Sequence, residues 1–117
     1  MELKIIELDD TCTHAGLVGR LDVIGALEMD NKLSDLIVGR KKNTVLDLSD
    51  VSFLGSVGIR LFVEIAKALG REGCKLILAN PRPMVKEVLD ASAIGTHIPI
   101  ESDIEKALKK ARAATTG

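Results

Sequence analysis

The sequence predicts a single α/β domain, in which about four helices pack on a mostly parallel, mixed β-sheet that begins with an antiparallel hairpin. Three observations lead to this fold class. The chain has 117 residues, which suffices for one hydrophobic core and not for two. Short aliphatic segments alternate with segments of helical periodicity, as in parallel sheets joined by right-handed crossovers. With no Trp, no Tyr and two Phe, the core must be aliphatic, which suits Val, Ile and Leu strands beneath helices.

The N-terminal segment is expected to form a β-hairpin. Apolar residues alternate in part over residues 3–8, and a second strand-like segment covers residues 11–18. Between them, Asp9-Asp10 is typical of a turn. Because this link is so short, the two strands should pair in antiparallel orientation.

A helix is expected next, over about residues 23–38. Asp22 precedes it at the position of an N-cap, where a carboxylate can accept hydrogen bonds from the free amides of the first turn. Gly39 marks its end. The apolar residues near one face, which we expect to point toward the core, are Ile24, Leu27, Leu33, Leu36 and Ile37.

The middle of the chain contains the clearest strand and helix. Residues 44–48 form a nearly continuous apolar strand, as expected in a sheet that is covered on both faces. A polar turn that includes Ser49 and Ser52 should follow it. A helix should then begin at Ser56 and continue to about residue 70. Its apolar stripe lies opposite a charged side, which is the pattern of an amphipathic helix.

The C-terminal third continues the alternation. Strands are expected over residues 75–79 and 96–100. The helix between them should extend through about residue 91, because Pro81 and Pro83 are tolerated in a first turn.

A final helix is expected over residues 103–113, after the capping-box pattern Ser102-x-x-Glu105. Residues 115–117 should fray. The predicted order of elements is therefore β-β-α-β-α-β-α-β-α.

Composition excludes several classes of function. Sixteen Lys and Arg against seventeen Asp and Glu give a formal charge of −1, so the chain lacks the electrostatic footprint of direct nucleic-acid binding. The N-terminus has no signal-peptide pattern, and no apolar run is long enough to cross a bilayer. We therefore expect a cytoplasmic protein without membrane contact.

The two cysteines, Cys12 and Cys74, have neither paired nor ligand-like spacing. Each is expected to be a buried, reduced thiol. No metal site and no cofactor are expected.

Ser56 stands where a helix is expected to begin, and its hydroxyl has three possible roles. It can cap the helix. It can act as a nucleophile, although Leu54 replaces the first glycine of the Gly-x-Ser-x-Gly elbow, and neither His14 nor His97 has the pattern of a catalytic base.

The third role of Ser56 is to accept a phosphate. The amides and the dipole of a helix N-terminus favour negative charge there. Gly55 and Gly58 leave little side-chain bulk beside the hydroxyl, so the active site of another protein could approach it.

The segment from Asp47 to Ile59, Asp-Leu-Ser-Asp-Val-Ser-Phe-Leu-Gly-Ser-Val-Gly-Ile, resembles the signature of bacterial anti-sigma-factor antagonists of the STAS-domain family. In that family an apolar strand is followed by Asp and an apolar residue, and then by an aromatic and an apolar residue. The next position is usually Asp. It is followed by Ser, then by Ser or Thr, then by Gly, and then by Leu or Ile. A second segment, Gly19-Arg20-Leu21-Asp22, is similar to the family's Gly-Glu/Arg-Leu/Ile-Asp after the second strand. The resemblance covers nearly all of the chain and implies one STAS domain over residues 1–117.

The resemblance implies a phosphorylation switch without a catalytic residue in this chain. In the family, the unphosphorylated antagonist binds an anti-sigma factor, which is itself a serine kinase, and so frees the sigma factor. The kinase then phosphorylates the serine that corresponds to Ser56, and this ends binding. A serine phosphatase restores the unphosphorylated form. On this basis we assign partner binding to Asp22, Gly55, Ser56, Val57, Gly58 and Arg60.

The chain departs from the family pattern at two positions. Gly55 stands where the family usually has an acidic residue, and Val57 stands where a second hydroxyl usually follows. Some STAS domains instead serve, without a phosphorylated serine, as accessory subunits of transporters or lipid-trafficking complexes. This is the alternative function. For the isolated chain we expect a monomer.

Overall fold

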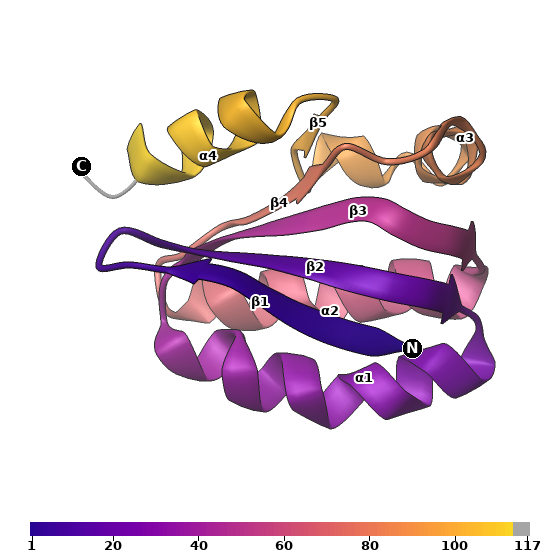
Figure 1. Cartoon of the computed structure of the whole chain (residues 1–117), viewed down its shortest axis with the longest axis horizontal. Coiled ribbons are helices and arrows are strands. Elements are labelled where there is room, and N and C mark those ends of the chain that lie inside the picture. Colours follow the sequence, from indigo (N-terminus) through magenta and orange to yellow (C-terminus); the bar gives the residue numbers. More distant parts are fainter. Residues whose placement is uncertain (114–117) are drawn as a thin grey trace.

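The computed structural model describes residues 1–113, which form one five-stranded sheet with helices on both faces (Figure 1). The strands are β1 (Glu2–Leu8), β2 (Cys12–Leu21), β3 (Asn43–Leu54), β4 (Leu76–Ala79) and β5 (Ile100–Glu101). The helices are α1 (Val23–Leu36), α2 (Ser56–Arg71), α3 (Pro83–Ala91) and α4 (Ile104–Ala113), with short 3-10 helices η1 (Val38–Arg40) and η2 (Ile94–Thr96). The expected fraying of residues 115–117 lies outside the described residues.

The sheet topology confirms the predicted fold class. The strands are hydrogen-bonded in the order β1-β2-β3-β4-β5. β1 runs antiparallel to β2, and the other neighbouring strands are parallel. In Figure 1, α1 and α2 lie below the sheet and α3 and α4 lie above it. The central strands are therefore covered on both faces, as their nearly continuous apolar sequence predicts.

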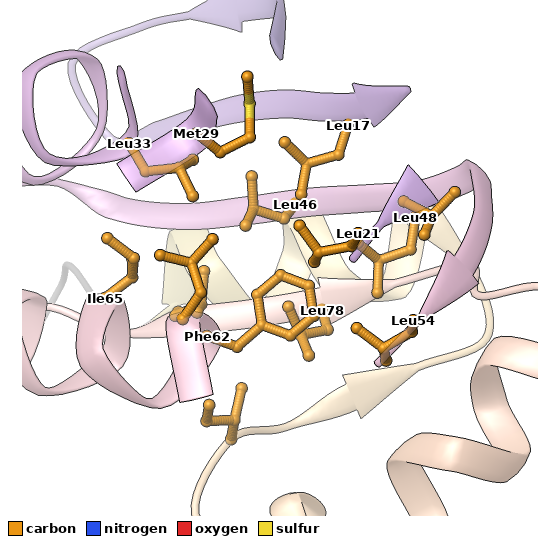
Figure 2. Close-up of a cluster of buried hydrophobic side chains, with 14 of the residues drawn as sticks. Leu17, Leu21, Met29, Leu33, Leu46, Leu48, Leu54, Phe62, Ile65 and Leu78 are labelled. Atoms are coloured by element: carbon orange, nitrogen blue, oxygen red, sulfur yellow. The ribbon is translucent and has the colours of Figure 1, made fainter. Parts of the chain in front are cut away.

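The main core lies between the sheet and the helices α1 and α2. Figure 2 shows leucines of β2 and β3 meeting Met29 and Leu33 of α1 and Phe62 and Ile65 of α2. Burying one side chain of this kind contributes about 1.5–3 kcal/mol. The predicted apolar stripe of α2 is confirmed, and its buried residues are Gly58, Leu61, Phe62, Ile65 and Leu69.

A smaller cluster packs α4 onto the opposite face of the sheet. It contains Cys12, Val45, Ile77, Ala79, Ala107 and Ala111. Cys12 is buried, as expected, whereas Cys74, just after α2, is only half-buried, so the expectation of two buried thiols is wrong for one of them. Both thiols are free.

The predicted polar turn after residue 48 is wrong, because β3 continues to Leu54. The pairing of β3 with β2 shifts register at two places. Opposite Gly19 and Arg20, which are consecutive in β2, stand Val51 and Phe53, so Ser52 is an extra residue in β3. A β-bulge leaves its extra residue unpaired and bends the strand, so a short polar segment there resembles a turn. Ser49 and Ser52 are thus strand residues.

The last strand begins later than predicted and has only two residues, which pair with Leu78 and Ala79 of β4. The preceding segment forms η2 instead. The amide of Ile98 donates to the carbonyl oxygen of Ile94 at 2.9 Å, and both side chains are buried. Two buried residues four positions apart belong to a helical turn and not to a strand. The short apolar segment alone does not distinguish these two structures.

The capping box predicted for α4 is also wrong. Asp103, and not Ser102, caps the helix, because its Oδ1 accepts a hydrogen bond from the amide of Glu105 at 2.9 Å.

The predicted core face of α1 is wrong in part. Ile24, Leu27 and Leu36 are 69%, 72% and 49% exposed. The residues of α1 and its C-cap that face the core are Ala26, Met29, Leu33 and Ile37. Their spacing of three and four residues is the repeat of one helical face. Helix α1 therefore carries more large apolar residues than the core uses.

Candidate functional site

Ser56 is the first residue of α2 and lies just after the C-terminal end of the central strand β3. Its side chain is exposed. The N-cap of α2 is Gly55, in an extended conformation with φ of −102°, and the cap has no side-chain hydrogen bond. The interpretation of Ser56 as the cap is therefore wrong. Its hydroxyl lies at the positive end of the helix dipole and is not needed to start the helix.

The ends of β2 and β3 are joined beside Ser56. The amide of Gly55 donates to the carbonyl oxygen of Leu21 at 3.1 Å, and Leu21 pairs with Leu54. The two sequence segments that resemble the family therefore meet in space. Gly19, at the start of the first segment, has a φ of +115°, which glycine adopts without strain and other residues rarely adopt.

Asp22 caps α1, as the sequence predicts. Its Oδ1 accepts a hydrogen bond from the amide of Gly25 at 2.9 Å, and its Oδ2 lies 3.5 Å from Nε of Arg20. The Gly25 amide, followed by the Arg20 guanidinium, lowers the pKa of Asp22 below its ordinary value. The carboxylate is therefore an anion at neutral pH, and it stays partly exposed beside the start of α2.

Gly58 lies under this site and not on its surface. It is buried, and a Cβ added to it would lie 2.6 Å from Cδ1 of Leu54 and 2.7 Å from Cγ of Leu21. Glycine is thus required for α2 to approach the ends of β2 and β3. The structure gives Gly58 a packing role in place of the expected role as a surface beside the hydroxyl.

Beside Ser56, a shallow groove of about 170 Å³ runs between α1 and α2. Its apolar lining comes from both helices, and Asp30, Arg60 and Glu64 supply its charged groups. Two predicted partner-binding residues, Val57 and Arg60, line this groove. The full set of lining residues is Val23, Ala26, Leu27, Asp30, Val57, Arg60, Leu61 and Glu64.

Three large aliphatic side chains at the start of α1 are exposed next to this groove. Val23, Ile24 and Leu27 are 57%, 69% and 72% exposed, and we name them the α1 ridge. They directly follow Asp22, so they lie at the same end of the molecule as Ser56. The sequence analysis missed them as surface residues. The available signal was that the apolar residues of α1 cover more than one helical stripe.

Neither histidine lies at the Ser56 end of the sheet. His14 is in the first half of β2, seven residues before Leu21, and His97 lines a different groove beside Ala66 and Lys67 in the second half of α2. Within residues 1–113, no group of three or more His, Cys, Asp or Glu is placed to hold a metal ion.

The sequence profile of the STAS domain matches residues 5–107. The chain belongs to the STAS domain family. It is similar to BtrV, a candidate anti-sigma factor antagonist of Bordetella bronchiseptica, with 26% identity over 92% of this chain and 91% of that protein. The resemblance inferred from the residues around Ser56 is therefore confirmed at the level of the family.

Solved structures agree with the STAS fold. SpoIIAA, an anti-sigma factor antagonist, is 21% identical. Its unphosphorylated form matches with a TM-score of 0.78 over 96% of this chain and 97% of that chain. Its phosphorylated form, from Bacillus, matches with a TM-score of 0.69 over 95% and 100%.

A transporter contains a related segment. Sulfate transporter 3.1 of Arabidopsis thaliana is 38% identical over 55 residues, which are 46% of this chain and only 8% of the transporter. In residues 1–113 of the present chain, no helix combines the length and the apolar character needed to cross a membrane.

Proposed function

We propose that this STAS domain is a cytoplasmic anti-sigma-factor antagonist controlled by phosphorylation of Ser56. The unphosphorylated form binds an anti-sigma factor with serine kinase activity and so releases the sigma factor. The kinase phosphorylates Ser56, which ends binding, and a serine phosphatase reverses the modification. In this proposal the chain is a substrate and a binding partner and has no catalytic residue of its own.

One observation carries the proposal: Ser56 is an exposed hydroxyl beside an exposed apolar surface. The α1 ridge and the groove between α1 and α2 adjoin it. Exposed apolar side chains in a contiguous patch are typical of protein–protein contacts. A kinase bound there would have the serine within reach. We therefore assign the binding surface to Asp22, Gly55, Ser56, Val57 and Arg60 together with the α1 ridge.

The position of Ser56 also explains how one phosphate could end binding without unfolding the domain. A negative charge at a helix N-terminus is favoured by about 0.3–1 kcal/mol, so the fold tolerates the phosphate. At an apolar interface, the same charge of about −1.5 to −2 must be desolvated, and Asp22 adds a second negative charge nearby. The phosphate therefore destabilises the complex with the kinase and not the fold of the domain.

The relative in Arabidopsis favours one alternative, an accessory STAS domain of a transporter. That function needs no modification of Ser56. The gene neighbourhood is the cheapest observation that separates the two, because an antagonist is expected beside genes for a sigma factor and its kinase, and an accessory domain beside transporter genes.

Two substitutions at Ser56 test the proposal against the purified anti-sigma kinase, with ATP. Ser56→Ala should bind as tightly as the parent protein and take up no phosphate, because the side chain neither caps α2 nor packs in the core. Ser56→Asp should fold, since an acid is favoured in the first helical turn, and should bind at least about tenfold more weakly, or about 1.4 kcal/mol. Calorimetry measures the affinities and intact mass measures phosphate uptake.

Amide spectra of the phosphorylated protein provide the structural control. They should match those of the unmodified protein outside residues 50–60 and the adjoining residues 20–25. Phosphate uptake by Ser56→Ala, together with equal affinities of the two variants for the kinase, would show that Ser56 is not the switch.

A further inference from the structure

Arg20 contacts both Asp22 and the Phe53 ring, and the proposed switch gives it no role. It pairs with Phe53 across β2 and β3, and its Cζ lies 4.4 Å from the centroid of the Phe53 ring. This distance is typical of a cation–π contact, which orients the guanidinium and leaves its N–H groups free to bind elsewhere. Arg20 is therefore held in place by a contact that does not use its hydrogen-bond donors.

The Phe53 ring brings Arg20 close to the residue before Ser56. A Cβ added to Gly55 would lie 3.3 Å from Cε2 of Phe53, so the ring lies against the Gly55 backbone. The Arg20 guanidinium thus contacts the Phe53 ring, and the ring contacts the N-cap of α2, Gly55. Ser56 is the next residue in the chain. An oxygen added to the Ser56 hydroxyl would extend from the same exposed end of the molecule.

The present anionic partner of Arg20 is weakly held. Nε of Arg20 lies 3.5 Å from Oδ2 of Asp22, and the two side chains are 62% and 37% exposed. Ion pairs that are this exposed contribute little, and Asp22 has its main hydrogen bond with the amide of Gly25. A phosphate carries more charge than a carboxylate and offers three acceptor oxygens, to which an arginine can bind in bidentate fashion.

We propose that Arg20 exchanges partners when Ser56 is phosphorylated: its guanidinium leaves the carboxylate of Asp22 and binds the phosphate on Ser56. This inference rests on the proposed function and adds a change of ion-pair partner within the same chain. The phosphate is then partly neutralised by its own domain, and Asp22 becomes an unpaired carboxylate beside the α1–α2 groove. The exchange does not remove the added negative charge, because Asp22 loses its cation as the phosphate gains one. The surface therefore remains less suited to the kinase.

Arg60 is the competing candidate, because it lies one helical turn after Ser56, at the i+4 position. It lines the α1–α2 groove together with Asp30 and Glu64. The Phe53 ring orients Arg20 and lies against Gly55, whereas Arg60 lies in the groove between the two helices. Arg60 therefore provides the matched control.

The test uses the full chain with phosphoserine incorporated at position 56 during synthesis, so no kinase is required. A ³¹P NMR titration measures the second pKa of the phosphate, which is about 6 for an unpaired phosphoserine. Arg20→Gln should raise this pKa by about half a unit relative to the parent, because a nearby cation stabilises the dianion. Arg60→Gln should change it by less than half as much, and Arg20→Lys should give an intermediate value.

The nitrogen resonance of Arg20 Nε gives a second measurement in the parent protein. It should move with the titrating phosphate in the phosphorylated form and stay constant over the same pH range in the unmodified form. Equal phosphate pKa values in the parent and Arg20→Gln proteins, or a larger rise in Arg60→Gln, overturn the proposal. Failure of the kinase to bind or to modify Ser56 would instead count against the proposed function and would leave these titrations unchanged.

Discussion

Helices α1 and α2 pack on the same face of the sheet, yet they use their apolar residues differently. In α2, the large apolar side chains at the centre of the stripe are buried, as their spacing predicts. In α1, only Met29 and Leu33 among the large apolar residues are buried, and the α1 ridge faces solvent at the Ser56 end. Both helices contribute to the main core, but of the two only α1 has exposed large apolar side chains.

The difference suggests how to separate residues for stability from residues for binding in this domain. A buried apolar residue contributes to the free energy of unfolding, whereas an exposed one contributes almost nothing to it. Three exposed aliphatic side chains beside Ser56 therefore favour a protein–protein contact at this surface. The comparison can be tested by one substitution in α2, by a matched pair in α1 and by one at the N-cap of α2.

The largest effect is expected from α2. Phe62→Ala should lower the free energy of unfolding by about 3–5 kcal/mol, because the ring is fully buried at the centre of the main core (Figure 2). Urea denaturation measures the change. A loss below about 1 kcal/mol would show that the core does not depend on the α2 stripe, and the comparison of the two helices would then fail.

A smaller effect, on binding alone, is expected from the α1 ridge. Leu27→Gln should leave the free energy of unfolding within about 0.5 kcal/mol of the parent, because the side chain is 72% exposed. It should weaken binding to the anti-sigma kinase about tenfold, since apolar contacts near the centre of an interface carry much of its energy.

Leu36→Gln is the matched control for Leu27→Gln. Leu36 is also an exposed leucine of α1, 49% exposed, but it is the last residue of the helix, at the end away from Ser56. Its substitution should leave binding unchanged. Equal losses of affinity in the two variants would argue against a localised ridge.

The same two helices show how far the sequence predicts this structure. Spacing alone predicted α2, because its apolar residues form one stripe. It failed for α1, because Ile24 and Leu27 also follow a helical repeat, and no local pattern says which of two stripes meets the sheet. The bulge at Ser52 was missed for a similar reason, since the pairing of β3 with β2 is a long-range property. The resemblance identified the region around Ser56, whereas the α1 ridge required the tertiary structure.

The smallest effect is expected at Gly55, where the chain departs from the family pattern. Gly55→Asp should be tolerated, because the residue has a φ of −102° and needs no left-handed conformation. Aspartate is a better N-cap than glycine by a few tenths of a kcal/mol. Part of this gain is offset because the new Cβ would lie 3.3 Å from Cε2 of Phe53, whose ring must move slightly.

The free energy of unfolding of Gly55→Asp should therefore change by less than about 0.5 kcal/mol. Binding to the kinase should be kept or improved, because the substitution restores the acid that the family usually has before its acceptor serine. Calorimetry with the kinase and thermal unfolding of the free domain measure the two quantities. Unchanged stability together with lost binding would mean that the partner of this chain recognises the glycine, and that its contact with the start of α2 differs from the family's usual one.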